Sequence, residues 1–172
     1  RFRNNNNDEL IQHFFGIIIT TKEKKFNEKK LTLMHFTREK NTLHFIYVLP
    51  FSQNKALIES TVFSKNVLHE DWYRAKIYNY LSSFQIDNFE EIGTEKGLIP
   101  MFFSDEQPSK DNNIFNIGIR GGACKPSTGY AFSFLIKQIQ LLKKSNKNYV
   151  NIHKFLERKM DKIFINFLKN NN

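Results

Sequence analysis

A glycine-rich segment that ends at Tyr130 constrains this chain more than any other stretch. Residues 121–130 read Gly-Gly-Ala-Cys-Lys-Pro-Ser-Thr-Gly-Tyr, with an expected strand before them over residues 112–119 and an apolar helix after them over residues 130–142. The glycine pair lets backbone approach another group closely, and Pro126 suits the first position of a helix because it lacks an N–H. Two interpretations follow: a helix start whose N–H groups face a phosphate or an anionic ring, or a structural turn with a cap.

The length of the chain is enough for one hydrophobic core, and its charge is compatible with several kinds of binding partner. The 172 residues carry 26 Lys and Arg against 17 Asp and Glu, for a formal charge of +9. The basic residues are scattered, so AT-rich coding bias, an anionic membrane surface and nucleic acid all remain explanations of this charge. The single cysteine, Cys124, excludes an internal disulfide and a zinc site built from cysteines. The five histidines lack ligand spacing such as i, i+4, and no metal site is expected.

The first part of the chain has the pattern of a largely antiparallel sheet with one helix. Strands are expected over residues 14–21, 31–37, 42–49 and 55–63. Pro50 is expected to end the third strand. Residues 70–84 have helical spacing, and residues 89–103 are extended again with interruptions at Gly93 and Gly97.

The last part of the chain changes to helix after a polar loop over residues 105–113. An apolar stripe runs along the segment from Ile152 to Leu168, beside lysines and an arginine. Its expected members are Ile152, Phe155, Leu156, Met160, Ile163, Phe164, Phe167 and Leu168. Such a stripe packs on the core of its own protein or lies on anionic lipid. A sheet followed by a tight turn and helices indicates an α+β or α/β class.

Glu59 is the carboxylate whose surroundings in the sequence best suit acid–base chemistry. Strand alternation puts it on the face shared by Leu57 and Thr61, opposite Ile58 and Ser60. A carboxyl among apolar side chains keeps its proton to a higher pH, because burial disfavours the charged form. The alternative is a glutamate on an edge strand that faces water.

Four motifs in order resemble those of the lycopene cyclases. They are Tyr-Val-Leu-Pro-Phe at 47–51, Leu-Ile-Glu-Ser-Thr at 57–61, Gly-Leu-Ile-Pro-Met at 97–101 and Lys-Pro-Ser-Thr-Gly-Tyr at 125–130. Residues 12–16 and 33–36 resemble two earlier segments of the family, and the resemblance covers residues 12–134. His35 departs from the pattern, because the family usually carries aspartate there. The chain also has no Gly-x-Gly-x-x-Gly after a first strand, so the dinucleotide fingerprint is missing.

The resemblance implies a partial FAD-dependent hydroxylase-like flavoprotein fold. We expect a mixed, largely antiparallel substrate-domain sheet with C-terminal helices, and a C-terminal fragment that lacks the N-terminal Rossmann βαβ unit. Residues 1–119 would form the substrate-binding sheet domain with one helix. Residues 120–172 would carry the cofactor-contacting turn and the helices that return to the FAD domain.

The resemblance also implies a function, the cyclisation of linear lycopene ends to β-ionone rings beside reduced FAD, with NADPH as reductant. Glu59 would be the acid–base carboxylate and Glu95 a second one. The expected cofactor contacts are Gly121, Gly122, Pro126, Ser127, Thr128, Gly129 and Tyr130. The expected substrate contacts are Phe45, Tyr47, Pro50, Phe51, Pro100 and Met101, because aromatic faces stabilise a cation. The protein would be cytoplasmic and peripheral to the membrane, with a linear carotenoid as partner and no nucleic acid.

Two alternatives remain at the level of sequence. One is another FAD-dependent reaction on an apolar substrate, such as a hydroxylation. The other is a non-catalytic basic module that binds a membrane or nucleic acid. The sequence does not distinguish a monocyclic from a bicyclic product, or a β-ring from an ε-ring.

Overall fold

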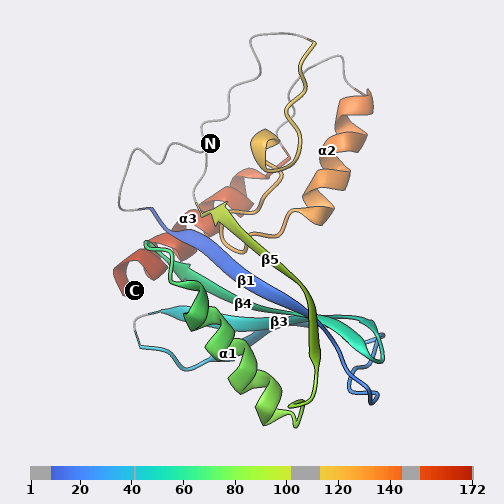
Figure 1. The fold of residues 1–172 in the computed structure, drawn as a ribbon. Helices are drawn as coiled ribbons and strands as arrows, with labels where there is room; N and C mark the ends of the chain where they lie inside the picture. The colour runs from blue at the N-terminus through green and yellow to red at the C-terminus, as the bar shows by residue number, and fades with distance from the viewer. Residues whose placement is uncertain (1–8, 41, 102–112, 145–151, 172) are drawn as a thin grey trace. The chain divides into compact units, whose positions relative to one another are not determined.

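The computed structural model describes residues 9–40, 42–101, 113–144 and 152–171, which have a mixed α+β fold (Figure 1). The chain divides into two units: residues 11–99 form a sheet unit, and residues up to 10 together with residues 100–171 form a helical unit. The sequence had placed the domain boundary between residues 119 and 120. In the structure the sheet unit ends at residue 99, one residue before the end of the fifth strand at Pro100.

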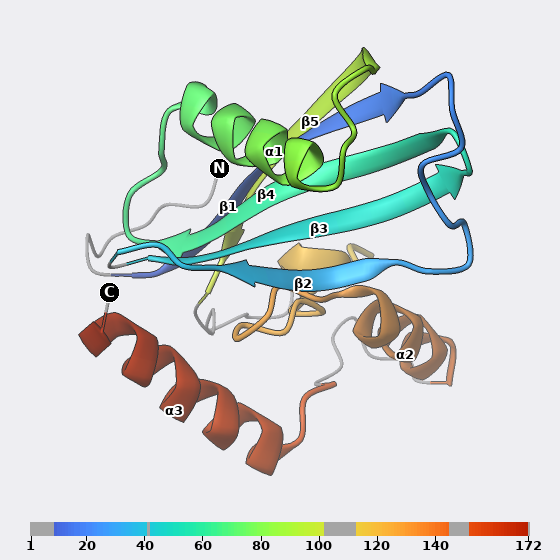
Figure 2. The same ribbon diagram turned by 90° about the horizontal axis from the view of Figure 1, so that it is seen from below.

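The sheet unit contains the expected strands and helix. They are β1 (Ile11–Thr20), β2 (Thr32–Thr37), β3 (Leu43–Ser52), β4 (Lys55–Ser64), α1 (Glu70–Ser83) and β5 (Glu90–Pro100). The strands form one five-stranded antiparallel sheet in the order β2-β3-β4-β1-β5. Consecutive strands β2, β3 and β4 are neighbours, whereas β1 lies between β4 and β5. Helix α1 lies across one face of the sheet (Figure 2).

The core of the sheet unit lies between α1 and the sheet face that it covers. Helix α1 contributes Tyr73, Ile77 and Leu81, which recur at helical spacing on its buried side. The strands contribute every second residue, as alternation requires. These residues are Phe15, Ile17, Ile19, Ile46, Val48, Ala56, Ile58 and Val62. The opposite sheet face therefore carries Glu59.

Two buried histidines on the α1 side link β4 to both of its neighbours. His13 Nε2 of β1 lies 2.8 Å from Ser64 Oγ, and His44 Nε2 of β3 lies 2.8 Å from Ser60 Oγ. The other nitrogen of each ring pairs with a second hydroxyl, which for His13 is the Tyr73 hydroxyl at 2.5 Å. Burial lowers the pKa of both histidines to about 4, so both rings are neutral at physiological pH.

Pro50 does not end β3, because the strand continues to Ser52. Pairing between β2 and β3 reaches only as far as Val48, so the missing N–H of Pro50 leaves no gap in a ladder on that side. Pro50 still pairs with Ala56 on β4, and the register shifts between Pro50 and Ser52.

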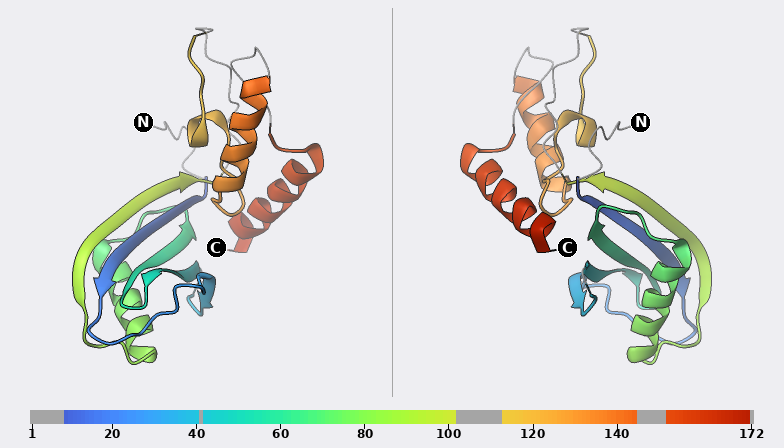
Figure 3. Two further views of the ribbon diagram at one scale, coloured as in Figure 1. Left: turned by 90° about the vertical axis from the view of Figure 1, so that its right-hand side faces the viewer. Right: turned by 90° about the vertical axis from the view of Figure 1, so that its left-hand side faces the viewer.

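Strand β5 is continuous across Gly93 and Gly97, where the sequence predicted interruptions. Side chains of β1 fill the space beside both glycines. A methyl group at position 97 would lie 2.6 Å from Phe14 Cζ, and one at position 93 would lie 3.5 Å from Ile18 Cδ1. Both glycines stay in the strand, which curves along its length beside β1 (Figure 3).

The helical unit contains a 3-10 turn at Gly118–Gly121, then α2 (Phe132–Lys144) and α3 (Phe155–Asn171). The strand expected over residues 112–119 is wrong. The described part, residues 113–117, has no regular structure, and Ile114, Phe115 and Ile117 are about half exposed. No strand pairs with this segment in the described part of the chain, and Gly118 turns it with a φ of +66°. The expected loop over 105–113 and the end of the expected extended segment, residues 102–103, lie outside the described residues, except for Asn113.

Helix α3 buries a different face from the one that the apolar pattern predicted. Ile165, Leu168 and Asp161 are buried, whereas most of the expected stripe is exposed. The exposed members are Phe155, Leu156, Met160, Ile163, Phe164 and Phe167. Among the helices of the described residues, none is long and apolar enough to cross a membrane.

Candidate functional site

Two glutamates approach each other over a glycine on the sheet face opposite α1. Glu59 of β4 pairs with Gly16 of β1 on one side and with Tyr47 of β3 on the other. Strand β5 lies beyond β1, and a methyl group at position 16 would lie 3.2 Å from Glu95 Cγ. Because Gly16 has no side chain, Leu57 and Glu95 lie close above it, and a methyl group there would lie 2.9 Å from Leu57 Cδ1. A side-chain hydrogen bond links Glu59 with Glu95.

The surroundings of Glu59 favour its protonated form. Burial is the largest cause and raises the pKa of Glu59, to about 7 in total. The Thr61 hydroxyl donates a hydrogen bond to Glu59 Oε1 at 2.7 Å, which lowers the pKa. The hydrogen bond and the charge of Glu95 raise it again. Near neutral pH, protonated and ionised Glu59 are therefore present in similar amounts.

Rows of mostly apolar residues border the carboxyl pair in both directions along the strands. The register places Phe45, Thr61 and Phe14 on one side and Leu49, Leu57 and Ile18 on the other. Phe45 and Leu57 are buried. The expected substrate residues Phe45 and Tyr47 thus share the face of Glu59, and Tyr47 is its direct neighbour on β3. Glu59 is half-buried and Glu95 is exposed, so the carboxyl pair is a polar centre that is open to solvent on the β5 side of an apolar and aromatic face.

The other expected substrate residues lie elsewhere. Strand alternation turns Pro50 away from the face of Glu59, and Phe51 is about half exposed after the register shift. Pro100 ends β5, and Met101, which is fully buried, belongs to the helical unit. The substrate roles of these four residues stay predictions.

Gly121 and Gly122 form a tight turn that is bonded within the helical unit. A methyl group at position 121 would lie 2.1 Å from Asn116 O, so only glycine fits there. Gln138 of α2 is fully buried; its Nε2 donates to Gly121 O, and its Oε1 accepts a backbone N–H of the same turn at 3.0 Å. Gly122 has a left-handed φ of +72°. The sequence correctly indicated a close approach at these glycines, but the partner is the protein's own backbone, and Gln138 was missed.

The segment after Lys125 is a closed turn and not the start of a helix, because α2 begins only at Phe132. The N–H groups of Thr128 and Gly129 donate to Lys125 O at 3.2 and 2.8 Å, and the Lys125 N–H donates to Tyr130 O at 2.9 Å. A φ of +74° at Gly129 closes the turn. These N–H groups are committed within the turn, so the expected anion-facing helix start at Pro126 is wrong.

Asp161 of α3, which the sequence analysis missed, is tied to this turn. Its Oδ1 accepts hydrogen bonds from Ser127 Oγ at 2.6 Å and from Lys125 Nζ. Asp161 and Ser127 are 3% and 5% exposed, and Asp161 Oδ2 is buried without a hydrogen-bond partner among the described residues. The sequence held one signal for this residue. Asp161 lies four residues before Ile165 and seven before Leu168, so it shares a helix face with these two buried residues.

Cys124 is also buried beside the turn, and its Sγ donates to Gly129 O at 3.2 Å. His35, at the position where the resembling family usually has aspartate, packs edge-on against Tyr80 of α1 with ring centroids 5.3 Å apart. Neither observation assigns these two residues a chemical role.

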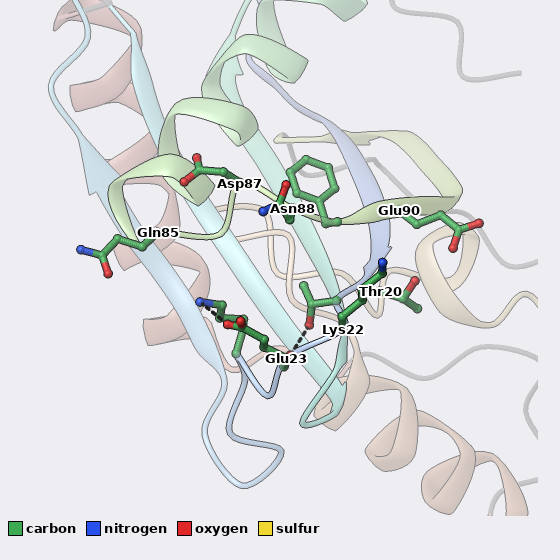
Figure 4. A pocket seen from close by; sticks show the side chains of 10 residues that line it. Thr20, Lys22, Glu23, Gln85, Asp87, Asn88 and Glu90 are labelled. Carbon is green, nitrogen blue, oxygen red and sulfur yellow. Dashed lines mark hydrogen bonds and ion pairs between the residues drawn. The ribbon is translucent and has the colours of Figure 1, made fainter.

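A separate open cavity of about 720 Å³ lies at one end of the sheet unit (Figure 4). Its lining is mostly polar and carries both charges. It consists of Thr20, Thr21, Lys22, Glu23, Lys25, Gln85, Asp87, Asn88, Phe89 and Glu90. An ion pair of 3.1 Å between Lys25 and Glu23 shows that its charges partly compensate one another. Over the described ranges, no group of three or more His, Cys, Asp and Glu side chains could hold a metal ion.

In comparisons with known proteins, the chain matches a family model. A family model described as "Lycopene cyclase protein" matches residues 2–166. No curated protein sequence matches the chain. Among solved structures, a geranylgeranyl bacteriochlorophyll reductase-like protein from Thermoplasma acidophilum matches with a TM-score of 0.49 and 13% sequence identity. That match covers 96% of this chain and 41% of the other, so the chain spans well under half of that protein. Because the family model extends over nearly all of the sequence, the chain belongs to the lycopene cyclase family.

Proposed function

We propose that this chain forms part of an enzyme that cyclises the linear ends of lycopene to β-ionone rings, with Glu59 as the proton donor. The observation that carries the proposal is the carboxyl pair of Glu59 and Glu95 in an apolar sheet face, with a pKa of about 7 for Glu59. Within the enzyme, residues 11–99 would bear the substrate face, and the turn at 125–130 would contact the cofactor.

The reaction is an isomerisation, so atoms and electrons balance without a net oxidant. A proton adds to the terminal alkene and leaves a tertiary carbocation, a neighbouring double bond attacks this cation, and a proton loss sets the double bond of the ring. An alkene is a very weak base, so the acid must still hold its proton at neutral pH. An ordinary surface glutamate has lost it, whereas burial and Glu95 keep Glu59 substantially protonated.

The two carboxyls divide the proton transfers between them. Glu59 would give its proton to the alkene, and the negative charge left on the pair would stabilise the cation nearby. The carboxylate of Glu59 or Glu95 would then accept the proton that leaves. Thr61, which donates to Glu59 Oε1 at 2.7 Å, holds one oxygen of the carboxyl in place.

Aromatic side chains of the same face would protect the cation. Phe45 and Tyr47 lie on β3, in the two rows that contain Thr61 and Glu59. Their ring faces attract positive charge, and the Phe45 ring carries no oxygen or nitrogen that would trap it. Apolar neighbours such as Leu57 exclude water, which would otherwise quench the cation.

The turn from Lys125 to Tyr130 would meet a flat ring rather than a phosphate. The N–H groups of Lys125, Thr128 and Gly129 are bonded within the turn, and Gly129 adds backbone without a side chain. The residues that would hold FAD are Gly121, Gly122, Pro126, Ser127, Thr128, Gly129 and Tyr130. When bound and reduced, with NADPH as reductant, a flavin would supply negative charge beside the developing cation.

Expression of the protein that contains this chain in lycopene-accumulating bacteria tests the proposal. Pigment analysis should show β-rings with the unchanged protein and little or no cyclised product with Glu59→Gln, while flavin content stays the same. Glu90→Gln is the matched control, because Glu90 is an exposed glutamate of the same sheet and should not change the product. Unchanged lycopene from a folded, flavin-loaded protein would refute the cyclase function.

Peripheral attachment to a membrane is the second part of the proposal, because the substrate is carried in lipid. The exposed apolar residues Phe155, Leu156 and Met160 stand on α3 beside the exposed Lys159 and Lys162. Sedimentation with anionic and with neutral vesicles tests this assignment. Binding to anionic vesicles should weaken with salt and with Leu156→Asp, and a protein that binds neither vesicle contradicts the attachment.

A further inference from the structure

We infer that Asp161 is a positioning residue that fixes the shape of the Lys125–Tyr130 turn from the distant helix α3. The inference deepens the proposed function and rests on it for one point only, the contact of this turn with flavin. The shape of the turn itself can be measured without flavin.

One carboxylate oxygen holds two side chains of the turn. Asp161 Oδ1 accepts from Ser127 Oγ at 2.6 Å and from Lys125 Nζ, so the beginning and the middle of the turn are bound to the same atom. The contact spans more than thirty residues of sequence, and Asp161 is only 3% exposed. A charge so deeply buried is retained only when it is paired, and Lys125 supplies the opposite charge.

The backbone bonds of the turn do not fix its position on their own. The bonds from Lys125 to Tyr130 and from Gly129 to Lys125 close the loop upon itself, but both partners belong to the loop. Gly129, within the turn, and Gly122, before it, have positive φ values that set the path of the backbone and bring no side chain that could anchor it. Asp161 therefore supplies an anchor outside the loop, on a helix.

Cys124 reports on this anchor because it is the only cysteine of the chain. Its Sγ is buried and donates to Gly129 O at 3.2 Å, so loosening of the turn exposes the thiol. The rate at which a disulfide reagent such as DTNB labels Cys124 in the 172-residue chain measures how often the turn opens.

Asp161→Asn and Asp161→Ala are the test variants, and Asn166→Ala is the control, because Asn166 is an exposed polar residue of the same helix. Asp161→Asn keeps the shape of the side chain and removes its charge. Both test variants should be labelled at least tenfold faster than the unchanged chain, and the control at the same rate. The double variant Lys125→Met, Asp161→Asn should be labelled at a rate within about twofold of that of Asp161→Asn alone, because both changes break the same ion pair.

Far-UV circular dichroism and the urea dependence of labelling separate a loose turn from an unfolded unit. Local opening gives labelling that does not accelerate in low urea, whereas global unfolding does. If Asp161→Ala fails to fold, Asp161→Asn decides the question. Labelling of Asp161→Asn within twofold of the unchanged chain overturns the inference.

Flavin added to the protein that contains this chain supplies a second readout, which would not change if Asp161 had only a structural role. Asp161→Asn should shift the visible absorption band of the flavin and raise the FAD dissociation constant at least fivefold, without loss of helix. Faster labelling of Cys124 with an unchanged flavin band would instead refute the flavin contact given to the turn. Failure of cyclisation with a normal flavin response would refute only the cyclase chemistry.

Discussion

Glu59 should make the sheet unit less stable as the pH rises, and Glu59→Gln should remove this dependence. The folded protein binds the proton of Glu59 with a pKa of about 7, against an ordinary value of 4.5. The unfolded chain therefore releases this proton first. The stability that goes with protonated Glu59 is fully present below pH 4.5 and is lost as the pH rises towards 7. At about 1.36 kcal/mol per pKa unit, this loss is about 3 kcal/mol.

Urea unfolding followed by tryptophan fluorescence measures this loss in the right part of the molecule. Trp72 is the single tryptophan of the chain and packs against the core from α1, inside the sheet unit. The free energy of unfolding is compared between Glu59→Gln and the unchanged chain at pH 4.5, 6 and 8. Titrating groups that do not interact with Glu59 are common to both proteins and cancel in the difference, which should grow by about 3 kcal/mol in favour of the variant.

Two further variants sharpen the result. Glu95→Gln removes a charge that raises the pKa of Glu59. The unfolding free energy of this variant should therefore fall less between pH 4.5 and 8 than that of the unchanged chain. Glu90→Gln should leave this loss unchanged, because Glu90 is not among the groups that shift the pKa of Glu59. The difference in unfolding free energy between Glu59→Gln and the unchanged chain could instead stay constant within about 0.5 kcal/mol from pH 4.5 to 8. That result would contradict the desolvation of Glu59 that the structure indicates.

Three more substitutions test the packing and the buried histidines. Gly97→Ala should lower the unfolding free energy by about 1–3 kcal/mol, because its methyl group would lie 2.6 Å from Phe14 Cζ. Gly93→Ala should change the unfolding free energy by less than about 0.5 kcal/mol, because its nearest contact would be 3.5 Å away. Equal effects of the two variants would contradict this packing. Burial lowers the pKa of both His13 and His44 to about 4, so the unfolding free energy should fall as the pH drops from 6.5 to 4. His44→Gln should remove the share of His44, about 3 kcal/mol, from this loss. An unaltered acid limb of the stability curve argues against the burial of His44. Gly121→Ala should unfold the helical unit, because its methyl group would lie 2.1 Å from a backbone oxygen, and a normal circular dichroism spectrum with a protected Cys124 would contradict this.

The strands were predictable from the sequence because their signal is local. Alternation and β-branched residues mark β1 and β4, and the face of Glu59 follows directly from that alternation. The ends of the strands were harder to predict. Pro50 stays inside β3 because β2 is too short to pair with it, and the length of β2 cannot be read from the sequence around Pro50. Gly93 and Gly97 stay inside β5 because side chains of β1, far away in sequence, fill their space.

The site was predictable residue by residue but not as an assembly. Both Glu59 and Glu95 were candidates, yet their approach depends on Gly16, which is inserted between them by the strand order β4-β1-β5. Sequence spacing carries no information on such an order. Asp161 was hidden for the same reason, because its partner Ser127 lies in another element and the exposed apolar residues of α3 suggested the wrong buried face.

The two histidine–serine bonds bear on whether the sheet assembles correctly or in a near-miss alternative. A slip of β4 by one residue would preserve a complete backbone ladder and the same strand content, yet it would bring Glu59 under α1 and send Ile58 to the other face. The same slip would break the bonds of Ser64 and Ser60 to the histidines on both neighbouring strands. These buried pairs therefore discriminate between two sheets that differ by a few ångströms, and only one of those sheets has a carboxyl pair.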